Sequence, residues 1–274
     1  MSAQSVLEFY CTRWGSEHIP WEAFAQSVKD SGYHGIEYGI AANTTQSELD
    51  KVWNLASQHQ LKIIPHHYDT VTRNFSQHQE EFSRWFEMVS PYPAEKINAQ
   101  TGRDCFSWEE NKILFQVACS HQENSAVQVI HETHRQRCLF AAHAARTALE
   151  RIPELKITLD ISHWICVAEN FLQDQTDAVD IAIRRTEHVH ARIGQPQGPQ
   201  VNDPRAPEWT DAVNTHVNWW KAIAKRFAQT GKILTITPEF GPAPYMPCAP
   251  FTNSPYANQW DINLHMMALL RERL

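Results

Sequence analysis

The stretch VIHETHRQR, residues 129–137, runs from two apolar residues directly into a group of acidic, imidazole and guanidinium side chains. The residues VQVI at 127–130 are typical of a buried strand and not of the start of a surface helix. Charge is costly in the core of a strand, yet Glu132, His134 and Arg135 follow within four positions. The pattern therefore predicts a buried strand whose carboxyl end carries a functional site.

A short apolar run followed by a helical stretch recurs along the whole chain. The expected strands are residues 6–14, 34–40, 61–68, 95–102, 125–134, 155–163, 186–194 and 232–242; the expected helices are residues 20–33, 45–60, 78–89, 107–122, 139–152, 174–185, 207–231 and 255–274. Pro20 and Gly32 are placed to begin and to end the first helix. Eight strand–helix units predict a (β/α)8 TIM barrel that forms a single domain over residues 1–274. An open doubly wound sheet is the alternative, but the turn after the first strand has no G-x-G-x-x-G pattern.

Composition and charge exclude several classes of function. The net charge of -7 offers no basic surface for DNA or RNA. The sequence shows neither a signal-peptide pattern nor an apolar run long enough for a membrane span. The six cysteines are scattered without a C-x-x-C pair, as in proteins that keep reduced thiols. We therefore expect a cytoplasmic protein that acts on a small molecule, with neither nucleic acid nor membrane as partner. Trp219 and Trp220 could contribute to an interface, which leaves a homo-oligomer open.

Polar side chains follow each of the expected strands, at the end where a TIM barrel carries its active site. The opposite ends of the strands are approached through ordinary solvated turns. The candidate site residues, in chain order, are Arg13, Trp14, His66, Asn98, Asp104, Glu132, His134, Asp160, His163, His190, Arg192 and Glu239. We expect the arginines, the histidines other than His190, and Asn98 and Asp104 to bind substrate, and Trp14 and Trp164 to form the floor of a pocket.

Alternation of side chains along a strand narrows this set to a metal site. Glu132, Asp160, His190 and Glu239 can converge from four consecutive strands. Three carboxylates and one imidazole repel one another unless a cation lies between them. Oxygen ligands with one nitrogen favour Mn²⁺ or Mg²⁺, with Co²⁺ or Zn²⁺ as alternatives. Each carboxylate taken alone is more often a salt-bridge partner or a helix cap, and His188 is expected to be a buried structural histidine.

The sequence resembles the xylose isomerase-like barrels, which include sugar isomerases and epimerases, inosose dehydratases and endonuclease IV. The resemblance rests on FAQSVKDSGYHGIEY (24–38), HET (131–133), LDISH (159–163), HVHAR (188–192) and TPEFG (237–241). It implies the same four metal ligands, with Glu132 and Glu239 as the two acid/base groups. His163 matches the family's substrate-binding histidine. Ketohexose epimerases of this family have a Glu and an Arg where this chain has Cys138 and Gln197, so the resemblance does not identify the substrate.

These observations predict a metal-dependent isomerase or epimerase that acts on a sugar through an enediolate. A bound ion would acidify the proton next to a carbonyl, and a carboxylate would remove and return it. The same groups could support a lyase or dehydratase on a keto-sugar or keto-inositol. A phosphoester hydrolase similar to endonuclease IV and a sugar-binding barrel without activity are further alternatives. Residues 194–209, the longest irregular stretch, are expected to form a lid or a substrate loop.

Overall fold

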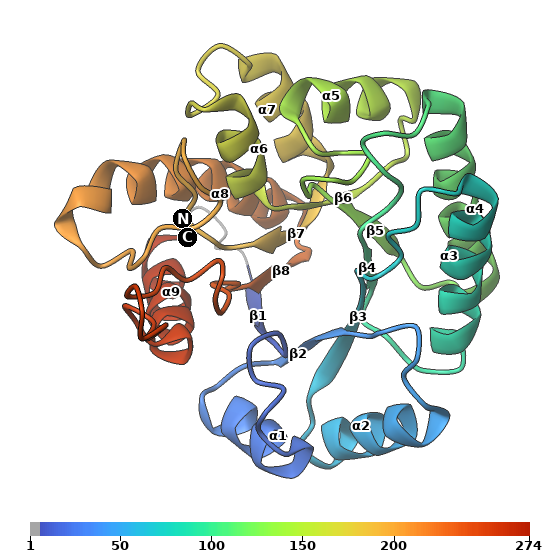
Figure 1. Ribbon diagram of the computed structural model, residues 1–274, viewed down its shortest axis with the longest axis horizontal. Coiled ribbons are helices and arrows are strands. Elements are labelled where there is room, and N and C mark those ends of the chain that lie inside the picture. Colours follow the sequence, from blue (N-terminus) through green and yellow to red (C-terminus); the bar gives the residue numbers. More distant parts are fainter. Residues whose placement is uncertain (1–5) are drawn as a thin grey trace.

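In the computed structural model, which describes residues 6–274, eight parallel strands close into a barrel. Each strand pairs with its neighbours in chain order, and β1 closes the barrel by pairing with β8. Figure 1 shows the strands around a central axis with the helices outside them. The strands are β1 Val6–Thr12, β2 Gly35–Gly39, β3 Lys62–His67, β4 Ile97–Ala99, β5 Val129–Glu132, β6 Ile157–Leu159, β7 Thr186–His190 and β8 Ile233–Thr237. This is the (β/α)8 barrel that the sequence predicts.

Eight of the helices lie close to the predicted positions, and α6 is not predicted by the sequence. The helices are α1 Trp21–Asp30, α2 Gln46–Gln58, α3 Phe75–Val89, α4 Trp108–Ser125, α5 Ala142–Arg151, α6 Ile161–Ala168, α7 Thr176–Arg185, α8 Thr210–Thr230 and α9 Gln259–Arg273, with a 3₁₀ turn η1 at Pro207–Trp209. Pro20 immediately precedes α1, and Gly32 follows it with φ +78°, as predicted. Ser107 and Glu110 form a capping box at the start of α4.

The strand predicted over residues 155–163 is wrong in its second half. β6 ends at Leu159, and the next residues form the short helix α6. The Asp160 carboxylate accepts a hydrogen bond from the Ser162 N–H at 3.1 Å, which stabilises the first turn of this helix. His163 therefore lies on α6 and not on the strand.

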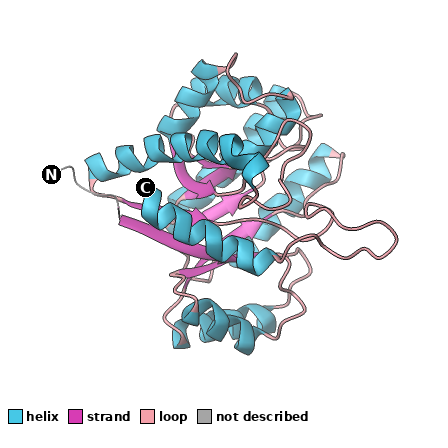
Figure 2. Ribbon diagram, turned by 90° about the vertical axis from the view of Figure 1, so that its left-hand side faces the viewer, coloured by secondary structure: helices cyan, strands magenta, loops and turns pink. Residues whose placement is uncertain are grey.

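Apolar packing occupies the layer between the strands and the surrounding helices. Figure 2 shows the strands enclosed by helices. The largest fully buried side chains include Trp85, Trp164 and Trp220. Trp164, predicted to form the floor of a pocket, instead donates from its indole N–H to the Leu139 carbonyl at 2.9 Å. Within residues 6–274, no helix is both long and apolar enough to cross a bilayer.

The barrel interior is polar, as the alternation in β7 and β8 predicts. Thr235 and Thr237 are buried beside His188. The Nδ1 atom of His188 lies 2.7 Å from Thr235 Oγ1, and its Nε2 lies 3.1 Å from Thr237 Oγ1. His188 is thus the buried, hydrogen-bonded histidine that the sequence favours.

The loop predicted as a lid is fixed to the barrel. Gln200 is buried, and its side-chain amide exchanges hydrogen bonds with the Gly241 backbone at 2.8 and 3.2 Å. The Val201 N–H donates to the Ile193 carbonyl at 2.9 Å. No residue of 195–209 is among those that line the main cavity of the described chain, so the structure gives this loop a packing role.

A buried histidine on α8 makes the stability of the fold depend on pH. His216 donates from Nδ1 to the Ala212 carbonyl at 2.8 Å and accepts the Gly194 N–H on Nε2 at 3.1 Å. Burial lowers the pKa of His216 to about 4, so the ring is neutral in the folded protein. The unfolded chain binds this proton near pH 6.5, and folding is therefore weakened as the pH falls below that value.

We predict that His216→Gln reduces the loss of unfolding free energy on acidification. A single histidine with this shift accounts for about 2 kcal/mol between pH 7 and pH 5. Urea denaturation of both proteins at the two pH values measures the difference. His143→Gln, a change at an exposed histidine of α5, is the control. An unchanged pH dependence in His216→Gln would contradict the assignment of a neutral, buried ring.

Candidate metal centre

Four side chains converge at the carboxyl ends of β5 to β8. Glu132 ends β5, Asp160 follows β6, His190 ends β7 and Glu239 lies two residues beyond β8. One potential ligand atom from each residue lies within 4.8 Å of those from the other three, and all four residues are buried. These are the four residues that strand alternation selects, and their role as ligands remains a prediction.

The orientation of His190 indicates what this cluster can hold. Its Nε2 lies 3.0 and 3.1 Å from the two carboxylate oxygens of Glu37, so Nε2 carries the proton and donates to Glu37. Its Nδ1 faces Glu239 Oε2 at 2.9 Å and Glu132 Oε1 at 3.5 Å, and it has no hydrogen-bond partner among the described residues. A bare lone pair on Nδ1 directed at two carboxylates is repulsive, so either a proton or a metal ion lies between them. The residues present therefore fit a metal ion.

Glu37 on β2 positions this imidazole from inside the barrel. Besides the two histidines His188 and His190, it accepts hydrogen bonds from Asn98 Nδ2 at 2.8 Å and Thr237 Oγ1 at 2.5 Å. Burial alone would raise the pKa of Glu37, but the two histidines hold it well below its ordinary value. A carboxylate behind a histidine ligand is the usual support of a metal site. Glu37 lies within the stretch 24–38 on which the family resemblance rests, but it is not among the candidate site residues predicted from the sequence.

The cluster is short of positive charge. Burial raises the pKa of Asp160 to about 6, with Arg192 opposing and Glu239 adding to the increase. Although burial disfavours a charged imidazole, the carboxylates of Glu239, Glu37 and Glu132 raise the pKa of His190 well above its ordinary value. Both pKa values are raised, so this group of carboxylates favours the binding of a positive charge. A divalent ion would supply that positive charge and would displace the proton on His190 Nδ1.

Arg192 lies beside the four candidate ligands and forms an ion pair with one of them, Asp160. It is 1% exposed, pairs with Asp160 Oδ2, and donates from Nε to Ser162 Oγ at 3.2 Å. Its Nη2 also lies 2.9 Å from His163 Nε2 and 3.7 Å from Glu239 Oε2. Arg192 therefore holds Asp160 in place, while another part of the side chain lines the cavity.

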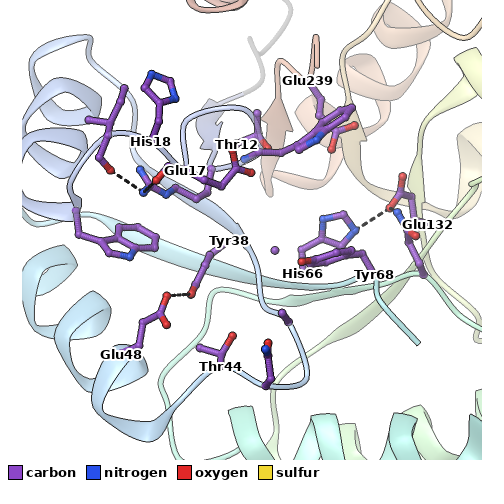
Figure 3. A pocket seen from close by; sticks show the side chains of 18 of the residues that line it. Thr12, Glu17, His18, Tyr38, Thr44, Glu48, His66, Tyr68, Glu132 and Glu239 are labelled. Atoms are coloured by element: carbon purple, nitrogen blue, oxygen red, sulfur yellow. Dashed lines mark hydrogen bonds and ion pairs between the residues drawn. The ribbon is translucent and has the colours of Figure 1, made fainter. Parts of the chain in front are cut away.

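A cavity of about 890 Å³ opens directly onto this cluster. Figure 3 shows Glu132 and Glu239 at one end of it and His66 and Tyr68 between them and the opposite end. Seven of the predicted site residues line it: Arg13, Trp14, His66, Glu132, His134, Arg192 and Glu239. Trp14 approaches so closely that a Cβ atom on Gly241 would lie 2.0 Å from its ring. Only glycine fits at position 241 with Trp14 in this place.

Three predicted substrate-binding residues do not line the cavity. Asn98 is buried below the cluster, where it donates to Glu37 and accepts from Thr158 Oγ1 at 2.7 Å. Asp104 is exposed on the loop after β4. His163 is fully buried behind Arg192. Asn98 and His163 therefore lie where they can support the site, whereas Asp104 lies outside the lining of the cavity.

Arg13 lines the cavity, and its guanidinium is partly engaged by its own loop, with Nη1 buried and without a partner among the described residues. Its Nη2 donates to the Glu17 and Ile19 carbonyls at 3.3 and 2.7 Å, and the group lies over the rings of Trp21 and Phe24 at 4.2 and 4.5 Å. Arg13 therefore orders the loop between β1 and α1.

Of two further residues outside the predicted set, Gln100 contacts the cluster and Tyr245 contacts the arginines beside it. Gln100 donates to Glu132 Oε2 at 3.0 Å and accepts from Arg137 Nε at 3.1 Å. Tyr245, from the loop after β8, lies within 4.7 to 5.0 Å of the guanidinium groups of Arg192 and Arg135. Gln100 follows β4 and so carried a positional signal, whereas the fold of its loop alone brings Tyr245 to the site.

His134 presents a neutral ring to the cavity. Its Nδ1 lies 2.5 Å from the Arg135 carbonyl and therefore carries the proton. Burial lowers the pKa of His134 to about 4, despite the opposing effect of Glu132. Its unprotonated Nε2 lies 3.4 Å from the Tyr245 hydroxyl. His134 can therefore act as a base or as a hydrogen-bond acceptor.

Comparison with known proteins shows relationships at the level of the fold. No protein-family model matches the chain, and no curated protein matches its sequence. The probable 3-DHS dehydratase AsbF of Bacillus anthracis is similar in structure, with a TM-score of 0.59 at 14% identity over 98% of this chain and 100% of that one. A family 2 AP endonuclease of Brucella melitensis matches with a TM-score of 0.59 at 12% identity over 86% of this chain and 93% of that one. The resemblance that the motifs indicate is thus confirmed for the fold.

We predict that Glu37→Gln weakens metal binding although Glu37 is not a ligand. The amide cannot accept the His190 N–H with a full negative charge, and loss of such support commonly reduces affinity by about 10- to 100-fold. Calorimetric titration of Mn²⁺ into the metal-free protein measures the change. Glu208→Gln, at an exposed position beside α8, is the matched control. Equal affinity in both variants, with unchanged melting temperatures, would show that the ion does not bind through His190.

Proposed function

We propose that the protein is a divalent-metal-dependent isomerase or epimerase that enolises a sugar or a sugar derivative. The observation that carries this proposal is the His190 Nδ1 atom, which faces Glu132 and Glu239 at the end of a cavity. Glu132, Asp160, His190 and Glu239 would hold the ion, with Mn²⁺ or Mg²⁺ the best match to the donors. When bound, the ion would polarise a carbonyl and acidify the adjacent C–H bond.

Glu239 is positioned to move the proton. Both of its contacts within the cluster, with His190 and Arg192, use Oε2. Oε1 is therefore available to take a proton from the substrate carbon and to return it. Glu132 is the second acid/base candidate, but its Oε2 already accepts from His66 Nε2 at 2.9 Å and Gln100 Nε2 at 3.0 Å. These bonds stabilise the charged form of Glu132 and favour its service as a ligand.

The proposal includes a substrate class and a cellular compartment. The substrate is a small carbohydrate, and the enzyme acts in the cytoplasm without nucleic acid or membrane as a partner. The net charge of -7 supports the exclusion of nucleic acid. A homo-oligomer remains part of the proposal, and one chain already supplies all four candidate ligands.

Elimination of water or an alcohol is the second candidate reaction. It requires a base for the proton and a donor for the leaving oxygen. His134 Nε2 and the Tyr245 hydroxyl, 3.4 Å apart, supply both types of group on one side of the cavity. The similarity in fold to a probable dehydratase is consistent with this chemistry. Formation of an unsaturated carbonyl product, seen by its ultraviolet absorbance, would identify a lyase.

We predict that the Mn²⁺-loaded protein exchanges the proton next to the carbonyl of a ketose with solvent. Incubation of D-fructose, D-tagatose and D-sorbose in D₂O, followed by NMR, measures the exchange. Glu239→Gln should slow it by about 10²- to 10⁴-fold, because the carboxylate base is lost. Glu208→Gln is again the control, and bound Mn²⁺ is quantified in every sample.

Other outcomes would favour the alternative functions. Exchange that persists in Glu239→Gln with bound metal would assign the base to another residue. Binding of a sugar with no exchange and no product would indicate a sugar-binding barrel. Cleavage of a phosphoester, with two or more ions bound per chain, would indicate a hydrolase similar to endonuclease IV. The described residues contain two other groups that could hold a metal ion. Glu37, His188 and His190 share His190 with the four-residue cluster, and Glu132, His134 and His163 share Glu132 with it.

A further inference from the structure

The cavity is larger than the proposed reaction requires. Its volume of about 890 Å³ lies near the top of the range of about 300–1,000 Å³ that holds drug-sized ligands. Enolisation of one sugar unit involves only the end formed by Glu132 and Glu239. Figure 3 shows that the cavity continues past His66 and Tyr68 to Tyr38, Thr44 and Glu48. A monosaccharide at the metal centre would leave this far end unoccupied.

We call this far end the outer subsite and define it by Trp21, Tyr38, Asn43, Thr44 and Glu48. These residues belong to α1, β2, the loop after β2 and α2, so none of them comes from a strand that supplies a candidate metal ligand. The subsite therefore contributes to binding separately from the metal centre.

The outer subsite combines aromatic surface with oxygen acceptors. The rings of Trp21 and Tyr38 pack edge to face with centroids 4.9 Å apart, and Trp21 is partly exposed. The Tyr38 hydroxyl donates to Glu48 Oε1 at 3.0 Å, which fixes the carboxylate and leaves its other oxygen as an acceptor. Thr44 and Asn43 add a hydroxyl and an amide. An apolar face with nearby charged acceptors suits a sugar ring, which has apolar C–H faces and hydroxyl donors at its edge.

The two cationic side chains at this end, Lys51 and Arg13, already have acidic or carbonyl partners, and the Nη1 atom of Arg13 is buried. Lys51 forms an ion pair with Glu22 at 2.9 Å. The guanidinium of Arg13 donates to the Glu17 and Ile19 carbonyls and lies over Trp21. Glu48 adds negative charge directly to the subsite. A phosphate or carboxylate group would meet repulsion from the Glu48 carboxylate, which favours a neutral occupant with hydroxyl donors.

We infer that the outer subsite binds a second, neutral sugar ring, and that the substrate is therefore a disaccharide or another glycoside. This inference rests on the proposed function, because it places the reacting unit at the metal centre. It defines the substrate class: two linked rings, with the carbonyl-bearing ring at Glu132 and Glu239 and its partner between Trp21 and Glu48. The second ring provides binding energy remote from the reacting carbon.

The test compares ketose disaccharides with a monosaccharide. Binding of D-fructose, lactulose, turanose, isomaltulose and D-fructose 6-phosphate is measured by calorimetry on the Mn²⁺-loaded protein. Saturation-transfer NMR shows which ring contacts the protein. We expect at least one disaccharide to bind about tenfold more tightly than D-fructose, with both rings saturated. Glu48→Gln and Trp21→Leu should abolish this gain and leave the affinity for D-fructose unchanged.

The controls separate this inference from the proposed function. Asp50→Asn is the matched control for Glu48→Gln, because Asp50 lies on the same helix but does not line the cavity. Equal affinity for the disaccharides and D-fructose, or a gain only for D-fructose 6-phosphate, would overturn the inference even if D-fructose exchanges its proton in D₂O. Tight disaccharide binding that depends on Glu48, without proton exchange, would support the outer subsite and refute the enolisation.

Discussion

The hydrogen bond from His190 to Glu37 lies inside the barrel, and the geometry of the candidate metal centre depends on it. Donation from Nε2 fixes which nitrogen of the imidazole carries the proton. The other nitrogen, Nδ1, then faces Glu132 and Glu239, where a metal ion could replace its proton. Without Glu37 the ring could rotate or exchange its proton, and the carboxylates above it would have no fixed nitrogen ligand. One buried acid on β2 thus determines the donor set formed by β5, β7 and the end of β8.

This arrangement has an energetic cost that the surrounding strands offset. A carboxylate in the barrel interior loses its hydration and requires several donors to compensate for it. Asn98 on β4 and Thr237 on β8, with the two histidines of β7, supply them. Asn98 in turn accepts from Thr158 on β6, so the network crosses the whole barrel. Closure of the barrel and the orientation of His190 therefore depend on one another, and most TIM barrels fill the same space with apolar residues.

The sequence predicts those parts of the structure that depend on local periodicity. The eight strand–helix units follow from hydrophobic runs, and alternation along β5, β7 and β8 places Glu132 and His190 on the inner face. The prediction fails where the contact partners are distant in the chain. Asn98 lies at the end of a strand, where a substrate-binding residue is also expected. Its amide instead donates inside the barrel to Glu37, which lies 61 positions away. Arg13 is engaged by carbonyls of its own loop, and the loop that carries Tyr245 has no periodic pattern from which its path over the site could be derived.

Different strands of the barrel supply the candidate metal ligands and the outer part of the cavity. β5 to β8 supply the residues proposed to hold the ion, whereas β1, β2 and their loops form the outer part of the cavity. Glu37 joins these two groups of strands directly at the candidate ligands, because it reaches from β2 to the imidazole on β7. A change at Trp21 or Glu48 can therefore alter which molecule fits without disturbing the ligand atoms of Glu132 or Glu239. The chemistry and the choice of substrate can vary separately, since the loops of a TIM barrel tolerate substitution while the strand ends keep their geometry.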